Sequence, residues 1–123
     1  MLTWADNCVE VSTTTTTGAY QLAGPAIDEQ PGAQTFVAGI GNANACYYYA
    51  HEVGGTAWER GIGTVADATP DTLARTTIHG SSNAGAAVDW TGKTVRIVAT
   101  LPAPALRRQG NLNALTLIAL GVI

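Results

Sequence analysis

The sequence predicts an all-β domain, a compact antiparallel β-sandwich or barrel of about eight short strands. Short runs rich in β-branched and aromatic residues recur along the chain, and turns containing glycine, proline or asparagine separate them every 8–12 residues or so, about the spacing of such folds. No window longer than about ten residues keeps a helical period. The chain has 123 residues, which is close to the usual size of one domain. We therefore expect residues 1–101 to form one β domain, with residues 1–8 as an N-terminal arm.

The first predicted strand covers residues 9–17 and contains the threonine run Thr13–Thr17. Threonine is stiff at χ1 and favours extended backbone, so the run continues the alternating valines before it. Gly18 permits the turn that follows. The second strand covers residues 19–23 and ends at a Gly-Pro pair.

The middle of the chain is expected to contain further strands at residues 34–38, 45–51, 56–65 and 72–78. Gly54-Gly55 suits a tight hairpin turn between the second and third of these. In the strand at 45–51, Tyr47 and Tyr49 share one face and Tyr48 lies on the other.

The last predicted strands, at residues 87–90 and 94–101, flank a turn at 91–93. Large apolar side chains of the predicted strands are expected to form the core. These are Tyr20, Leu22, Phe36, Tyr47, Trp58, Ile62, Leu73 and Ile97. For Trp4 and Trp90 the sequence leaves two alternatives open, the core or an exposed binding surface.

The C-terminal segment departs from this pattern. Residues 102–111 are a proline-broken connector, and residues 112–123 are almost wholly apolar but too short to cross a bilayer as a helix. The segment is expected to be either a last strand in the domain's own core or an arm buried against a second subunit or a capsid. The residues expected to contact other subunits or the capsid are Trp4, Leu112, Leu115, Leu117, Ile118, Leu120, Val122 and Ile123.

Charge is scarce: 12% of the residues are charged, about half the usual share of a soluble domain, and the net charge is −3. A surface with so few charges favours a protein that is largely covered by partners. Nucleic acid is not an expected partner, because only Arg107 and Arg108 among the basic residues are adjacent. A membrane is not expected either, since the sequence has neither a secretion signal at its start nor an apolar run of about 18 residues.

No motif of an active site or a cofactor site is present. His51 and His79 have no matching cluster of acids or cysteines, and no nucleophile motif surrounds Ser81-Ser82, so neither catalysis nor a metal is expected. The glycine pairs near 39–41 and 61–63 do not continue into a phosphate loop, so no nucleotide cofactor is expected. Cys8 and Cys46 are expected to be buried thiols, with a single disulfide as the alternative.

Six short segments follow one another in order between Val9 and Val98. They are 13–18 (TTTTTG), 20–24 (YQLAG), 46–48 (CYY), 58–64 (WERGIGT), 72–77 (TLARTT) and 81–85 (SSNAG). In this order and spacing they resemble a recurring module of tailed-bacteriophage virion proteins. The chain departs from that module in its loop at 28–32 and in its apolar C-terminus.

The resemblance implies a structural part of the particle, such as a capsid decoration, a head spike or fibre, or a tail-fibre segment, and it supplies no catalytic residues. We expect a non-enzymatic decoration (cement) or head-spike protein that forms a homotrimer on the outer surface of the capsid, binds the major capsid protein and stabilises the head. It would be made in the host cytoplasm. The alternative is a tail-fibre or receptor- and glycan-binding module that uses exposed Trp and Tyr. Within the module we expect Arg75 to pair with Glu59, and Trp58 and Ile62 to face the core.

Overall fold

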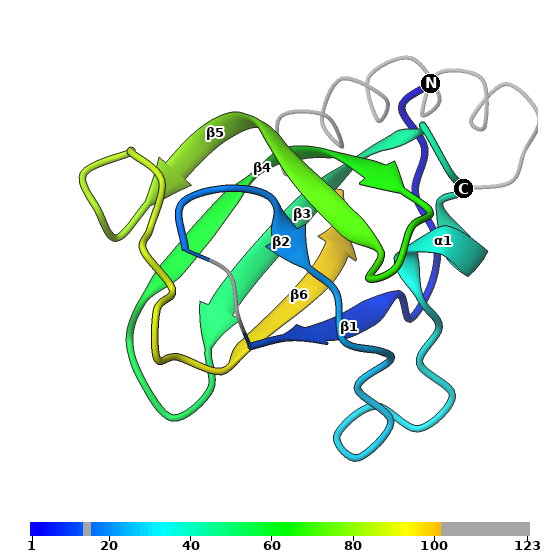
Figure 1. The fold of residues 1–123 in the computed structure, drawn as a ribbon, viewed down its shortest axis with the longest axis horizontal. Helices are drawn as coiled ribbons and strands as arrows, with labels where there is room; N and C mark the ends of the chain where they lie inside the picture. Colours follow the sequence, from blue (N-terminus) through cyan, green and yellow to red (C-terminus); the bar gives the residue numbers. More distant parts are fainter. Residues whose placement is uncertain (14–15, 102–123) are drawn as a thin grey trace, which may run out of the picture.

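The computed structural model describes residues 1–13 and 16–101, and in this part of the chain the fold is all-β, as the sequence predicts (Figure 1). A 6-stranded antiparallel sheet has the order β1-β6-β3-β4-β5-β2. The strands are β1 (Val9–Ser12), β2 (Tyr20–Gln21), β3 (Ala45–Glu52), β4 (Trp58–Ala66), β5 (Thr72–Ser81) and β6 (Val95–Thr100). One short helix, α1 (Phe36–Gly39), precedes β3.

Residues 22–26 nearly close this sheet into a barrel. β2 pairs with β5, and the amide of Leu22 extends that pairing by donating to Asp71 O at 2.9 Å. The chain then crosses to the opposite edge, where Ala23 N donates to Val11 O at 2.7 Å and Val11 N donates to Gly24 O at 3.0 Å. The same short segment thus joins β5 to β1, the two strands that would otherwise remain apart.

The barrel interior holds the core. Tyr20, Leu22, Phe36, Leu73 and Ile97 are buried, as predicted. Trp90 is also fully buried, which decides between its two alternatives in favour of the core, whereas Trp4 is 52% exposed.

The core prediction was wrong for Tyr47, Trp58 and Ile62, which are half-buried on the outer face of the sheet. Strands β3 and β4 instead turn alternate residues inward, and these include Tyr48 and Glu59. Because the inward positions of β4 carry a charge and two glycines, the outward face of this strand is the more apolar one in sequence. Hydrophobic alternation alone therefore points to the wrong face.

In the described part of the chain, two predicted strands are absent and a third is shorter than predicted. β1 ends at Ser12, so the described threonines after it lie in a loop. Residues 34–38 contain the first turn of α1, where Thr35 Oγ1 accepts from Ala38 N at 3.1 Å as an N-cap. Residues 87–90 form no strand but lie in the long loop between β5 and β6.

The N-terminal residues run along the barrel rather than projecting from it. Thr3 N donates to Ala45 O, and Ala45 N donates to Met1 O, both at 2.8 Å. Cys8 is fully buried. The predicted contact residues Leu112, Leu115, Leu117, Ile118, Leu120, Val122 and Ile123 lie outside the described residues. Over the described ranges, no helix is long and apolar enough to cross a membrane.

Candidate functional site

A buried carboxylate lies at the centre of the barrel. Glu59 Oε2 accepts from Tyr20 Oη at 2.8 Å and from Tyr48 Oη at 2.6 Å. It also accepts from Arg75 Nε at 2.8 Å, and Glu59 Oε1 contacts Arg75 Nη2. The two charged side chains are 0% and 3% exposed. The pairing of Arg75 with Glu59 expected from the sequence is thereby confirmed.

The network extends from this ion pair to the loops. Arg75 Nη1 donates to the carbonyl oxygens of Thr16 (3.0 Å) and Gly18 (3.2 Å), and its Nη2 donates to Val88 O at 2.7 Å. Val88 N returns a hydrogen bond to Glu59 Oε1 at 2.9 Å. Residues 16–18 and the loop between β5 and β6 are therefore attached to the same ion pair.

The protonation states of this network follow from its contacts. Burial alone would raise the pKa of Glu59, but hydrogen bonds from Arg75, Tyr48, Val88 N and Tyr20 outweigh it and bring this pKa below its usual value. Burial raises the pKa of Tyr20 and of Tyr48, so both phenols stay protonated and donate. Each group is occupied by structural hydrogen bonds, and the network therefore acts as a fixed centre of the fold.

Glu10 is a second buried carboxylate. Its Oε1 accepts from Gly24 N at 3.2 Å and its Oε2 from Phe36 N at 2.7 Å. Burial raises the pKa of Glu10, and these two backbone donors oppose the rise. The side chain ties β1 to the closing segment and to the start of α1.

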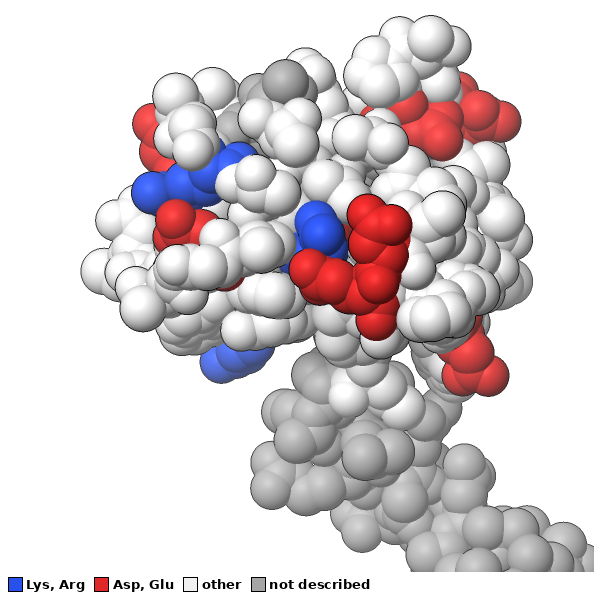
Figure 2. Space-filling model, turned by 90° about the horizontal axis from the view of Figure 1, so that it is seen from below, with Lys and Arg blue, Asp and Glu red and all other residues white. Residues whose placement is uncertain are grey.

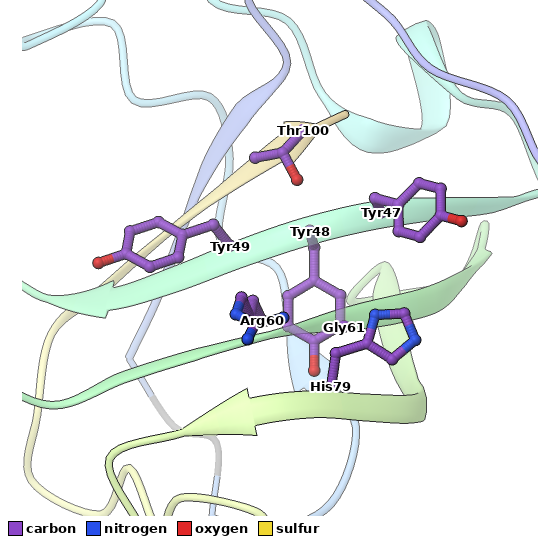
Figure 3. A pocket seen from close by; sticks show the side chains of 7 residues that line it. All are labelled: Tyr47, Tyr48, Tyr49, Arg60, Gly61, His79 and Thr100. Atoms are coloured by element: carbon purple, nitrogen blue, oxygen red, sulfur yellow. The ribbon is translucent and has the colours of Figure 1, made fainter. Parts of the chain in front are cut away.

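A pocket of about 240 Å³ opens on the outer face of the sheet (Figure 3). It is lined by Tyr47, Tyr48, Tyr49, Arg60, Gly61, His79 and Thr100. Tyr47 and Tyr49 come from β3, and Arg60 lies between them in the view of Figure 3. The rings of Tyr47 and His79 have their centroids 6.0 Å apart.

An irregularity of β5 brings His79 into this pocket. Arg60 is paired with Gly80, but the next residue of β4, Gly61, is paired with Ile78, so His79 is the extra residue of a β-bulge. Bulges re-aim side chains and are frequent next to functional sites. The sequence gives no signal for this bulge, and the meeting of His79 with Tyr47 was therefore not predicted.

Arg60 supplies the charge of the pocket. Its guanidinium lies over Gly80, where an added Cβ would be only 3.0 Å from Nη2. Among the described Lys and Arg side chains, Arg60 alone has no carboxylate within ion-pair distance, since Arg75, Lys93 and Arg96 pair with Glu59, Glu52 and Glu29. The pocket thus combines aromatic walls with an available cation.

A second hollow of about 350 Å³ lies beside the first. It is lined by Val9, Glu29, Gln30, His51, Arg96 and Val98. Arg96 Nη2 donates to Glu29 Oε1 at 3.1 Å, so the cation of this hollow already has a partner. The stacked rings of Tyr49 and His51, 5.7 Å apart, connect the two hollows along β3.

Charges elsewhere are dispersed. The face shown in Figure 2 is mostly uncharged, and its charged residues lie in small groups, in some of which basic and acidic side chains are adjacent. Within the described ranges, no three His, Cys, Asp or Glu side chains gather in a way that would hold a metal ion. No protein-family model matches this chain, and comparisons with curated proteins and with solved structures found no match.

Proposed function

We propose that this chain is a non-enzymatic structural protein of a tailed-bacteriophage particle, and that it decorates the head by binding the major capsid protein on its outer surface. One observation carries the proposal: the segments that resemble the phage module supply the residues that hold the barrel together. Such use of the motifs favours a rigid structural module over a catalytic domain.

The motif residues have identifiable structural roles. Glu59 and Arg75, from the segments WERGIGT and TLARTT, form the buried ion pair. Gly61 allows the close approach of β5, because an added Cβ would lie 2.0 Å from Thr77 O. In the segment SSNAG, Ser81 Oγ accepts from Asn83 N at 3.1 Å and donates to Ala86 O at 2.5 Å, which fixes the loop after β5.

The proposed mechanism is preferential binding to the assembled lattice. A protein that binds assembled capsid subunits, and not free ones, stabilises the lattice by mass action. Exposed Trp4 and the apolar residues 112–123 are the proposed contacts with the capsid or with the other subunits of a trimer. The scarcity of surface charge suits a protein covered by such neighbours.

The test is size-exclusion chromatography with light scattering, on the protein alone and mixed with expanded empty heads of the phage that encodes it. We expect a trimer that co-elutes with the heads, and a variant lacking residues 112–123 that does not. A protein that fails to co-elute with the heads, or a truncated variant that still binds them normally, would refute the proposal.

The outer pocket favours a second candidate, a receptor- or glycan-binding module of the virion. Tyr49 is 36% exposed beside the available cation Arg60, and aromatic rings of this kind provide contact area together with a polar group. This function predicts that the isolated protein binds sugars and that Tyr49→Ala weakens binding. Ile27→Ala, which removes an exposed apolar side chain outside the pocket, serves as the control.

A further inference from the structure

We infer that the outer pocket binds a sugar ring that carries a carboxylate, such as a hexuronate. This assignment deepens the second candidate function and rests on it, and it is independent of capsid binding. It is argued from the available cation, the aromatic walls and the position of the pocket in the sheet.

The guanidinium of Arg60 favours a ligand that carries an anionic group. A guanidinium presents five N–H donors in a rigid planar fork that matches a carboxylate. The other described cations already pair with carboxylates, whereas Arg60 has neither a hydrogen-bond acceptor nor an ion-pair partner among the described residues. A carboxylate on the ligand would give Arg60 the charge-assisted hydrogen bonds that it lacks.

The aromatic side chains and the size of the outer pocket favour a ligand with a single ring. Tyr47 and Tyr49 belong to the same outward face of β3, and the bulge of β5 adds the ring of His79. At about 240 Å³ the pocket is smaller than the usual site of a drug-sized ligand, about 300–1,000 Å³, so it suits a single ring. Tyr and Thr hydroxyls at the pocket, including that of Thr100, can both donate to and accept from sugar hydroxyls.

The position in the sheet disfavours an extended peptide. The pocket lies over β6, β3, β4 and β5, and most of its lining residues come from β3 and β4. β3 pairs with β6 and β4, and β4 pairs with β3 and β5. β3 and β4 have no free edge, so a peptide cannot bind over them by adding a strand. Recognition must come from side chains, which favours a compact ligand with many hydroxyls.

The experiment is a titration of the full 123-residue chain, followed by ¹H–¹⁵N NMR, with glucuronate, glucose, inorganic phosphate and a capped glutamyl peptide as probes. We expect glucuronate to shift the Arg60 Nε–H signal and the amides of Tyr47 and Tyr49, and to bind at least about tenfold more tightly than the other three probes. Arg60→Gln should weaken glucuronate binding by about tenfold or more. Lys93→Gln, which removes the same charge outside the pocket, should leave it unchanged.

The alternative outcomes separate the inference from the function on which it rests. Equal binding of glucose and glucuronate would overturn the acidic-sugar assignment and leave a glycan-binding module standing. Equal or tighter binding of phosphate would assign the pocket to a bare anion, and equal or tighter binding of the peptide would assign it to an acidic protein segment; either result overturns the inference. Absence of binding by any sugar would overturn both. Unfolding curves of Arg60→Gln that match the wild type would show that lost binding is not lost folding.

Discussion

At the scale of single residues, the dominant feature is the Glu59–Arg75 ion pair. Each partner is buried, and each has its hydrogen-bonding capacity used by the other, by tyrosine hydroxyls or by backbone groups. The net contribution of a buried ion pair to stability is small. Removing either partner, however, strongly destabilises the fold, because it leaves a buried charge without compensation.

Replacing Glu59 by Ala should therefore reduce the free energy of unfolding by about 3–5 kcal/mol, as for other broken buried pairs. Urea denaturation at neutral pH measures this. Glu29→Ala breaks the pair of Arg96 with a half-exposed carboxylate and should cost no more than about 1 kcal/mol. Similar losses for the two variants would contradict the central role of the buried pair.

The lowered pKa of Glu59 also predicts a dependence on pH. Because the folded-state pKa lies below the unfolded value of about 4.3, its contribution is present above that value and is lost as the pH falls through the folded pKa. We expect the stability advantage of the wild type over Glu59→Gln to shrink below about pH 4. The raised pKa of Glu10 acts in the opposite direction, but it is present in both proteins and cancels in the difference. A difference that is constant from pH 7 to pH 3 would argue against an ionised Glu59.

At the scale of elements, the sequence pattern predicts those strands that pair with a strand close in sequence. The hairpin of β3 and β4 around Gly54-Gly55 is found as expected, with His51 paired to Trp58. The described threonines of the run, Thr13, Thr16 and Thr17, lie outside any strand, and Thr16 accepts hydrogen bonds from Arg75 and from the amide of Trp90. Contacts between residues so far apart in sequence override β-propensity, and the local sequence pattern cannot predict them.

The candidate site was predictable to a similar degree. Alternation correctly places Tyr47 and Tyr49 on one face. Alternation does not tell which face is buried. The buried face is set by the ion pair between the inward Glu59 and Arg75 on the neighbouring strand. The position of His79 depends on the bulge in β5. The pocket could therefore be predicted only once the register of β4 against β5 was known.

The close contact of β4 and β5 gives a prediction for Gly61. Gly61→Ala places a Cβ 2.0 Å from Thr77 O, a backbone atom, so the strands must separate. We expect a loss of about 1–3 kcal/mol, as for other overpacked sites, seen as a lower urea midpoint. Gly18→Ala is the control, since Gly18 has open space around its Cβ position and should tolerate the change. A fully stable Gly61→Ala variant would mean that the two strands are further apart.

At the scale of the whole molecule, the barrel shields both thiols. Cys8 and Cys46 are free and fully buried, as the sequence predicts. Burial raises the pKa of each to about 12, and for Cys8 the charges of Cys46 and Glu10 contribute as well, so neither forms the reactive thiolate at neutral pH.

Both thiols should therefore react with a thiol reagent only when the barrel unfolds. We expect almost no modification of the native protein over minutes and modification of both cysteines in denaturant, counted by mass spectrometry. A Thr56→Cys variant, with a new thiol at an exposed position of the β3–β4 turn, should be modified once without denaturant. Rapid labelling of the wild type under native conditions would reveal frequent opening of the barrel.

The position of β6 has a consequence for the order in which the chain is synthesised. β6 is the last strand in sequence within the described residues, yet it lies between β1 and β3, and its register joins Val98 to Val9. Pairings between such distant residues form only after the long loop between them has closed. A nascent chain that ends before Val95 therefore carries a gap inside its sheet, with unpaired strands on both sides. The ribosome must therefore deliver the chain through β6 before the sheet can be completed between β1 and β3.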